Sequence, residues 1–275
     1  MAKHSKAIPP VGQCIYCGSE QGPLSDEHVV PYGLSGDHVL PKSSCSKCAA
    51  VTSRLEMRLL RGHWWPYRQF LGLKSRRSKQ PLPDLKVTIE HENGECSPAL
   101  LPMSKHSFAI TFCLAPPTIL SGIVSDEIPY ATKAFLRTLG PMPGSVRVAG
   151  KIQRLTPQEK INIPVDFHAP DLCRFLAKVA HSFAIYRRGL AACEEYFLPS
   201  YVLGQEAGAM TYVGGASSSI IGSWLPGNGT HALLDRVNGP FLSVYIQLFR
   251  HEGEPPPIYE VIVGRLRSES HMNDV

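Results

Sequence analysis

The sequence of 275 residues lacks any long run of apolar side chains that is free of helix breakers. Its first residues, MAKHSKAIPP, are partly basic and have no hydrophobic segment behind them, so we expect no secretory signal peptide and a cytoplasmic location. Two stretches without charge, 107–125 and 207–234, are interrupted by Pro116 and Pro117 in the first and by repeated glycines in the second. Neither favours a lipid-facing helix, and we therefore expect no membrane partner.

Acidic side chains are almost missing between Lys42 and Lys79, a segment with ten basic residues and one acid, Glu56. These residues give the segment a charge of +9, whereas the net charge of the whole chain is only +5. A concentrated positive field is typical of a surface that binds phosphate groups. For a charge run taken alone, a basic face that meets only solvent is an equally open interpretation.

Four of the eight cysteines form two close pairs, Cys14-Ile-Tyr-Cys17 and Cys45-Ser-Lys-Cys48. Thiols in the cytoplasm stay reduced, so their spacing rather than disulfide formation decides how they are interpreted. Two C-x-x-C pairs that are 27 residues apart predict a closed tetrahedral site for a structural Zn²⁺ ion. A redox role for one pair has no preceding apolar strand to support it, and it would leave the other pair unexplained.

Between the two cysteine pairs lies SDEHVVP, in which Glu27 and His28 are adjacent, and the second pair leads into a predicted helix. In this order of C-x-x-C, acid plus His, proline, C-x-x-C and helix, residues 12–62 resemble the HNH endonuclease superfamily, in its branch with a four-cysteine zinc site. The resemblance implies a ββα-metal fold in which zinc holds two strands and a helix. It also implies a metal-dependent nuclease that hydrolyses phosphodiester bonds, with double-stranded DNA as the partner.

The chemistry of that reaction suits the two adjacent residues. Phosphodiester hydrolysis needs a water that is deprotonated near neutral pH and a cation that neutralises the charge growing on the phosphate. An imidazole titrates close to the working pH, and the resemblance implies that His28 is the general base. A carboxylate suits Mg²⁺ or another hard divalent cation, and the resemblance implies that Glu27 is a ligand of this catalytic metal.

One position departs from the family pattern. Many relatives have an Asn or His directly after the last zinc cysteine, which completes the catalytic metal site, whereas this chain has Ala49. On a helix Ser53 and Glu56 share the face of Ala49, and we expect Ser53 to help through a water and Glu56, about 10 Å along the axis, to lie too far away. His38 is a further candidate ligand. The alternative hypothesis is therefore a catalytically impaired zinc protein that binds nucleic acid without cleaving it.

The helix after the second cysteine pair carries two stripes of side chains. Val51, Leu55 and Leu59 recur at intervals of four residues and predict a buried face. Trp64 and Trp65, which follow in HWWPYRQF, are more typical of a small core than of base stacking. The basic residues of this segment that we expect to bind nucleic acid are Lys47, Arg54, Arg58 and Arg61.

A segment with two prolines, from Ser78 to Asp84, predicts a domain boundary near residue 80. We expect a zinc-containing nuclease module in residues 1–80 and a larger accessory domain of α+β class in residues 81–275. An enzyme confined to the second domain ranks last among the hypotheses, because we find no acid, base or nucleophile constellation in its sequence.

The second domain alternates between strand-like and helix-like segments. Asp171–Arg188 has helical apolar spacing, with Asp171 as the expected N-cap and Gly189 as the end. Two apolar runs near the C-terminus predict an antiparallel hairpin that begins near Phe241. The other predicted strands are Lys86–Glu90, Ser107–Cys113, Ser145–Ala149 and Ile161–Phe167. The fold class predicted for the chain is therefore α+β with an antiparallel sheet.

Overall fold

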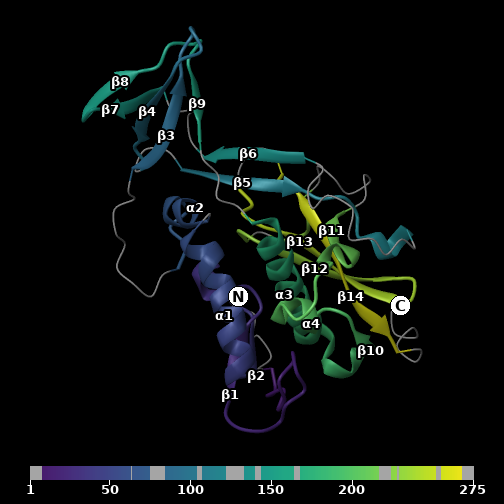
Figure 1. Ribbon diagram of the computed structural model, residues 1–275. Coiled ribbons are helices and arrows are strands. Elements are labelled where there is room, and N and C mark those ends of the chain that lie inside the picture. Colours follow the sequence, from purple (N-terminus) through teal and green to yellow (C-terminus); the bar gives the residue numbers. More distant parts are fainter. Residues whose placement is uncertain are drawn as a thin grey trace.

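The fold is α+β, and among the described residues every strand pairing is antiparallel (Figure 1). Within the same residues no helix is both long and apolar enough to cross a membrane. The computed structural model describes residues 8–62, 64–74, 84–103, 107–121, 133–139, 144–163, 168–216, 224–227, 229–251 and 255–267.

The chain begins with two strands and a helix. β1 (Leu24–His28) pairs with β2 (Val39–Cys45), and the turn η1 (Tyr32–Leu34) lies in their connection. Helix α1 (Ser46–Arg61) follows β2 directly, because Cys45 is both the last residue of the strand and the N-cap of the helix. This order of strand, strand and helix is the one predicted for the segment between the cysteine pairs and beyond.

The apolar stripe of α1 is buried as predicted, with Leu55 and Leu59 in the core and Val51 half-buried. The short helix α2 (Trp65–Phe70) comes next. Trp64 is buried, and its ring centroid lies 5.0 Å from that of Phe175 and 5.2 Å from that of Phe249. Trp64 is therefore a core residue, as the sequence predicts.

A small sheet has the strand order β8-β7-β4-β3-β9 and lies apart from the other elements, beyond α2 in Figure 1. Its buried side chains form a separate cluster around Ile89 and Leu101. Within the described residues, β5 (Ser107–Cys113) and β6 (Lys133–Leu139) pair with each other alone. The strands of the small sheet are β3 (Leu85–Glu90), β4 (Cys96–Leu101), β7 (Ser145–Val148), β8 (Lys151–Arg154) and β9 (Lys160–Asn162).

A long central helix, α3 (Ala169–Arg188), packs against α1 and, on its other side, against β13 and β14 of the second five-stranded sheet (Figure 1). The sheet has the order β10-β14-β13-β12, and β11 also pairs with β14. Its strands are β10 (Cys193–Tyr196), β11 (Val213–Gly215), β12 (Ala232–Asn238), β13 (Phe241–Gln247) and β14 (Ile258–Leu266). The remaining elements are η2 (Thr118–Ser121), η3 (Leu190–Ala192), α4 (Pro199–Leu203) and η4 (Ala209–Thr211).

Most strands predicted for the second domain are present, as β3, β5 and β7, and β13 and β14 form the predicted hairpin. Strand β9 covers only the start of the segment predicted up to Phe167, and residues 164–167 lie outside the described residues. The helix α3 ends at Gly189 as predicted. Its predicted N-cap is wrong: His168 is the N-cap, because the proline at the second helical position extends the first turn upstream of Asp171.

The predicted boundary near residue 80 falls among residues 75–83, which lie outside the described residues. Buried side chains of the N-terminal segment, of α3 and of the β10–β14 sheet belong to one continuous cluster. The small sheet has its own cluster. Residues 8–62 and 64–74 therefore pack as part of the larger core, and their independent folding stays a prediction.

Candidate functional site

The two cysteine pairs converge on one point. The sulfur atoms of Cys14, Cys17, Cys45 and Cys48 all lie within 4.8 Å of one another, and those of Cys17 and Cys45 are 3.7 Å apart. A tetrahedral zinc ion with Zn–S bonds of about 2.3 Å has sulfur–sulfur edges of about 3.8 Å. The four cysteines can therefore hold a metal ion such as zinc.

Local backbone geometry explains how the chain brings the thiols together. The N–H of Gly18 donates to the Cys14 carbonyl over 2.8 Å, and Gly18 has a φ of +71°, which favours glycine. The second pair lies at the N-terminus of α1. There the Cys48 N–H lowers the pKa of the Cys45 thiol to about 7. Because zinc binds thiolates, the helix start favours the metal-binding form of this cysteine.

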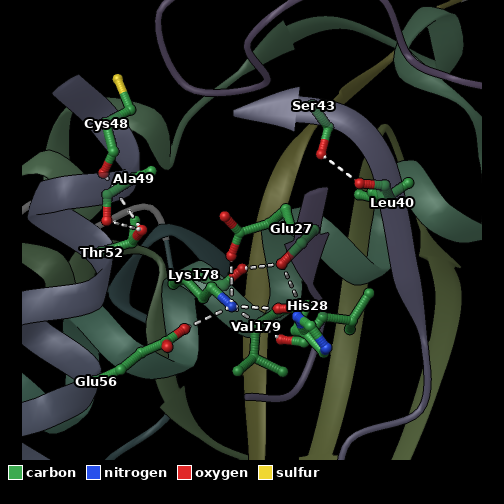
Figure 2. Close-up of polar contacts among 12 residues, drawn as sticks. Glu27, His28, Leu40, Ser43, Cys48, Ala49, Thr52, Glu56, Lys178 and Val179 are labelled. Atoms are coloured by element: carbon green, nitrogen blue, oxygen red, sulfur yellow. Dashed lines mark hydrogen bonds and ion pairs between the residues drawn. The ribbon is translucent and has the colours of Figure 1, made fainter. Parts of the chain in front are cut away.

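Glu27, the predicted ligand of the catalytic metal, is bound to an ammonium group of the same chain. Its Oε1 lies 2.7 Å from Nζ of Lys178 in α3, and Oε1 of Glu56 in α1 lies 2.9 Å from the same nitrogen. Figure 2 shows Lys178 reaching between β1 and α1 to meet both carboxylates. The Lys178 side chain has no exposed surface, and 7% of the Glu27 and 19% of the Glu56 side chain are exposed.

The Lys178 ammonium has two further acceptors. It donates to the backbone carbonyl of His28, and to that of Val29 over 3.3 Å. Burial by itself would lower the pKa of Lys178, but the carboxylates of Glu27 and Glu56 outweigh it and hold that pKa above its ordinary value. Lys178 is therefore a charged group in the interior at neutral pH.

The expectation that Glu56 lies too far along α1 is wrong, since it shares the Lys178 ammonium with Glu27. The other candidates for the metal shell have different surroundings. Ser53 is on the exposed side of α1, and the ring of His38 lies edge-on to that of Tyr186, at 4.7 Å between centroids. Ala49 is only half-buried and contributes its carbonyl to a hydrogen bond within α1 (Figure 2).

His28, the predicted general base, is the last residue of β1 and is half-buried. Its ring centroid lies 6.1 Å from that of Tyr32, with the two rings nearly perpendicular. The contact between His28 and Lys178 is made by the backbone carbonyl. Through its backbone, His28 thus belongs to the group of oxygen atoms that surround the Lys178 ammonium.

The predicted nucleic-acid-binding side chains lie on the exposed face of α1. Separations of seven, four and three residues keep them within about 60° of one another around the helix. Nε and Nη2 of Arg58 also donate to the two carboxylate oxygens of Asp171, each over 2.7 Å, although 52% of the Arg58 side chain stays exposed. The four residues are Lys47, Arg54, Arg58 and Arg61.

Lys178 and its site were missed in the sequence, because residues 27, 56 and 178 are far apart along the chain. A cleft of about 740 Å³ was missed for the same reason. It is lined by the β1–β2 connection, the end of α3 and β12, which are far apart along the chain. The signal for Lys178 was a lysine within the otherwise apolar stretch Phe175–Ala180 of the predicted helix.

A chain of polar side chains in the small sheet was also missed. Nε2 of His91 lies 2.8 Å from Oγ of Ser97, and Nδ1 lies 2.8 Å from Oε1 of Glu159. The second carboxylate oxygen of Glu159 accepts from the Thr156 N–H over 2.9 Å. The sequence analysis did not find this hydrogen-bonded group, because Glu159 is distant in sequence from the other two residues.

Comparisons with protein families, with curated proteins and with solved structures found no match to this chain. The resemblance of residues 12–62 to the HNH superfamily therefore stays a prediction from their motif. What the chain does has to be inferred from the cysteine cluster, the ion pairs of Lys178 and the basic face of α1.

Proposed function

We propose that this protein binds nucleic acid through the basic face of α1, on a ββα module held by a structural zinc ion. In this proposal Glu27 and His28 do not form a site that cleaves the nucleic acid. The observation that carries the proposal is the pairing of Glu27 with the buried Lys178 ammonium. A divalent ion at Glu27 would have to displace this charge into water or leave it buried without a partner. Removing one partner of a buried pair is strongly unfavourable.

The basic face supports the binding half of the proposal. From Lys47 to Arg61 the face spans about 21 Å of helix, and its side chains are exposed. Cations on one face attract phosphates without reading sequence, and an α-helix fits the major groove of double-stranded DNA. Double-stranded DNA is therefore the partner that we propose.

A metal-dependent endonuclease with His28 as general base is the second candidate. The observation that favours it is that His28 follows Glu27 directly at the end of β1 and that its side chain is half-buried, beside Tyr32. This function requires Mg²⁺ or another divalent ion to bind Glu27 in place of Lys178. The two candidates share the zinc site and the basic face, so cleavage of the phosphodiester bond separates them.

Binding is tested by fluorescence anisotropy with a labelled DNA duplex. We expect affinity to fall steeply between about 50 and 200 mM salt, and R54Q/R61Q to bind roughly tenfold more weakly with a smaller salt dependence. The matched control is K151Q/R154Q, which removes the same charge from exposed positions of β8 and should leave affinity unchanged. Equal weakening by both variants would contradict a binding site on α1.

Cleavage is tested with supercoiled plasmid and Mg²⁺ or Mn²⁺, comparing the wild type with His28→Ala. We expect no nicking by either protein. Nicking by the wild type that is lost in His28→Ala would overturn the proposal in favour of the endonuclease. Equal nicking by both would exclude His28 from the cleavage, as the proposal states, and would place the hydrolytic site elsewhere.

A further inference from the structure

The acceptors around the Lys178 ammonium are all oxygen atoms. They are the carboxylates of Glu27 and Glu56 and the backbone carbonyls of His28 and Val29. Carboxylate and carbonyl oxygens are the ligands that hard divalent cations take in proteins, and an ammonium has only three protons to share among four such acceptors. The set of ligands is therefore that of a cation site.

The formal charges lead to the same description. Two carboxylates and one ammonium leave a charge of −1 in a cluster whose central atom is fully buried. A divalent ion would balance both carboxylates, whereas the ammonium balances one of them. The cluster is thus richer in negative charge than a lysine alone requires.

We propose that Glu27, Glu56 and these two carbonyls form a binding site for a divalent cation, and that in this chain the Lys178 ammonium occupies it in place of the metal. One consequence of this proposal rests on the proposed function: because no metal binds beside His28, the protein does not hydrolyse DNA there. The cation site itself is independent of whether the protein binds DNA.

The occupant comes from a different part of the chain and joins that part to the module. Lys178 lies one helical turn before His181 on α3, and Nε2 of His181 donates to the Ile15 carbonyl over 2.7 Å. Ile15 lies between the first two zinc-site cysteines. One face of α3 therefore meets both β1 and the cysteine cluster, which places the ammonium between the two carboxylates.

Two substitutions at this position separate the site from its occupant. Lys178→Ala removes the ammonium and leaves space for a metal ion with some of its waters, which Mg²⁺ and Mn²⁺ retain in protein sites. Lys178→Met removes the same charge but fills the space with an apolar chain of similar length. If the oxygen atoms form a cation site, Lys178→Ala should bind a divalent cation and Lys178→Met should not.

The experiment is a titration of the zinc-loaded full-length protein with Mn²⁺, in which free Mn²⁺ is measured by electron paramagnetic resonance. We expect the wild type and Lys178→Met to bind no Mn²⁺ at millimolar concentration, and Lys178→Ala to bind about one ion with a Kd of about 10⁻⁴ M. Adding Glu56→Gln to Lys178→Ala should weaken this binding at least roughly tenfold, since it removes a charged ligand. Zinc content and circular dichroism establish that each variant is folded.

Two outcomes of this titration overturn the proposal. The first is a folded Lys178→Ala variant that binds no Mn²⁺, because the oxygen atoms then do not form a cation site. The second is Mn²⁺ binding by the wild type that is lost in Glu27→Gln, because the native occupant is then a metal. Either result leaves the DNA-binding comparison of α1 unaffected, since that comparison uses other residues and another readout.

A measurement on the wild type covers the case in which Lys178→Ala does not fold. Reductive methylation followed by mass spectrometry should modify the exposed Lys151 and Lys160 and leave Lys178 unmodified. Millimolar Mn²⁺ should not change this protection. Modification of Lys178 at the rate of Lys151, or a rise in its modification when Mn²⁺ is added, would show that the ammonium leaves the site and would overturn the proposal.

Discussion

Two clusters of polar side chains connect distant parts of this chain, and they differ in how much water they meet. In the first cluster, Lys178 joins Glu27 and Glu56, and its side chain has no exposed surface. In the second, His91 bridges Ser97 and Glu159 over equally short distances, yet 30% of the His91 side chain is exposed. Hydrogen-bond length alone therefore does not distinguish them.

The difference in burial determines what each cluster contributes. A buried ion pair gives little net stability, but breaking it leaves a charge without a partner and costs about 3 to 5 kcal/mol. The buried cluster therefore fixes where β1 and α1 lie relative to α3. A partly exposed cluster exchanges its bonds for bonds to water at smaller cost. The His91 cluster should accordingly add little to the position of the β3–β4 turn.

The largest effect that we predict for this comparison follows removal of the zinc ion that we propose for the cysteine cluster. The segment with β1, β2 and the start of α1 is small, and a structural zinc site supplies much of the folding energy of such units. A strong chelator, or Cys48→Ser, should abolish hydrogen-exchange protection of the β1 and β2 amides and leave β13 and β14 protected. Mass spectrometry of peptides from these strands measures the difference.

Persistence of protected β1 and β2 amides in protein shown by metal analysis to be free of zinc would contradict this prediction. It would also change the comparison, because the ion pairs of Lys178 and the shared core would then hold the module by themselves. A matched control is Cys173→Ser, which changes a buried cysteine outside the metal cluster. Cys173→Ser should leave zinc content unchanged.

The sequence predicts the parts of the site that depend on local order. The spacing of the cysteine pairs places four thiols together once β2 leads directly into α1, and the apolar stripe of α1 identifies its buried face. Lys178 could not be placed in this way. A lysine in a helix is usually exposed, and its burial here results from α3 lying between α1 and a sheet, an arrangement set by the whole fold.

The error over Glu56 has a related cause. The distance between Glu56 and Ala49 along α1 follows from helix geometry. The distance that decides whether Glu56 joins the site is the one to Glu27 on β1. How α1 crosses β1 depends on packing against α3, and periodicity within one helix contains no information about that packing. The two carboxylates therefore converge although their spacing in the sequence gives no sign of it.

The next largest effect is a pH dependence of stability that comes from His181. This residue has no exposed surface, and burial lowers the pKa of its imidazole to about 4. Below a pH of about 6.5 the imidazole binds a proton in the unfolded chain but not in the folded protein. The contribution of His181 to the free energy of unfolding is therefore fully present above that pH and is lost as the pH falls. Between about pH 7.5 and 5.5 this loss should be about 1 kcal/mol.

Urea unfolding of the wild type and of His181→Gln at the two pH values measures this contribution. Glutamine keeps a donor for the Ile15 carbonyl but does not titrate, so the variant should lose about 1 kcal/mol less than the wild type on acidification. Any release of zinc near pH 5.5 affects both proteins alike. An identical pH dependence of the two proteins would mean that the folded protein protonates His181 as readily as the unfolded chain does. The side chain would then be in contact with water, as would the neighbouring Lys178 cluster on the same face of α3.

The smallest effect predicted is that of His91→Ala in the small sheet. The substitution removes both hydrogen bonds of the partly exposed His91 cluster, and we expect the thermal unfolding midpoint to fall by no more than about 2 °C. Ser97→Ala, which removes only one of the bonds, is the matched control and should have a similarly small effect. A fall of about 10 °C for His91→Ala would equal the loss expected from a buried charge pair. In that case exposure would not explain the difference between the two clusters, and the explanation would have to come from the cores beneath them, since the small sheet has a separate core of its own.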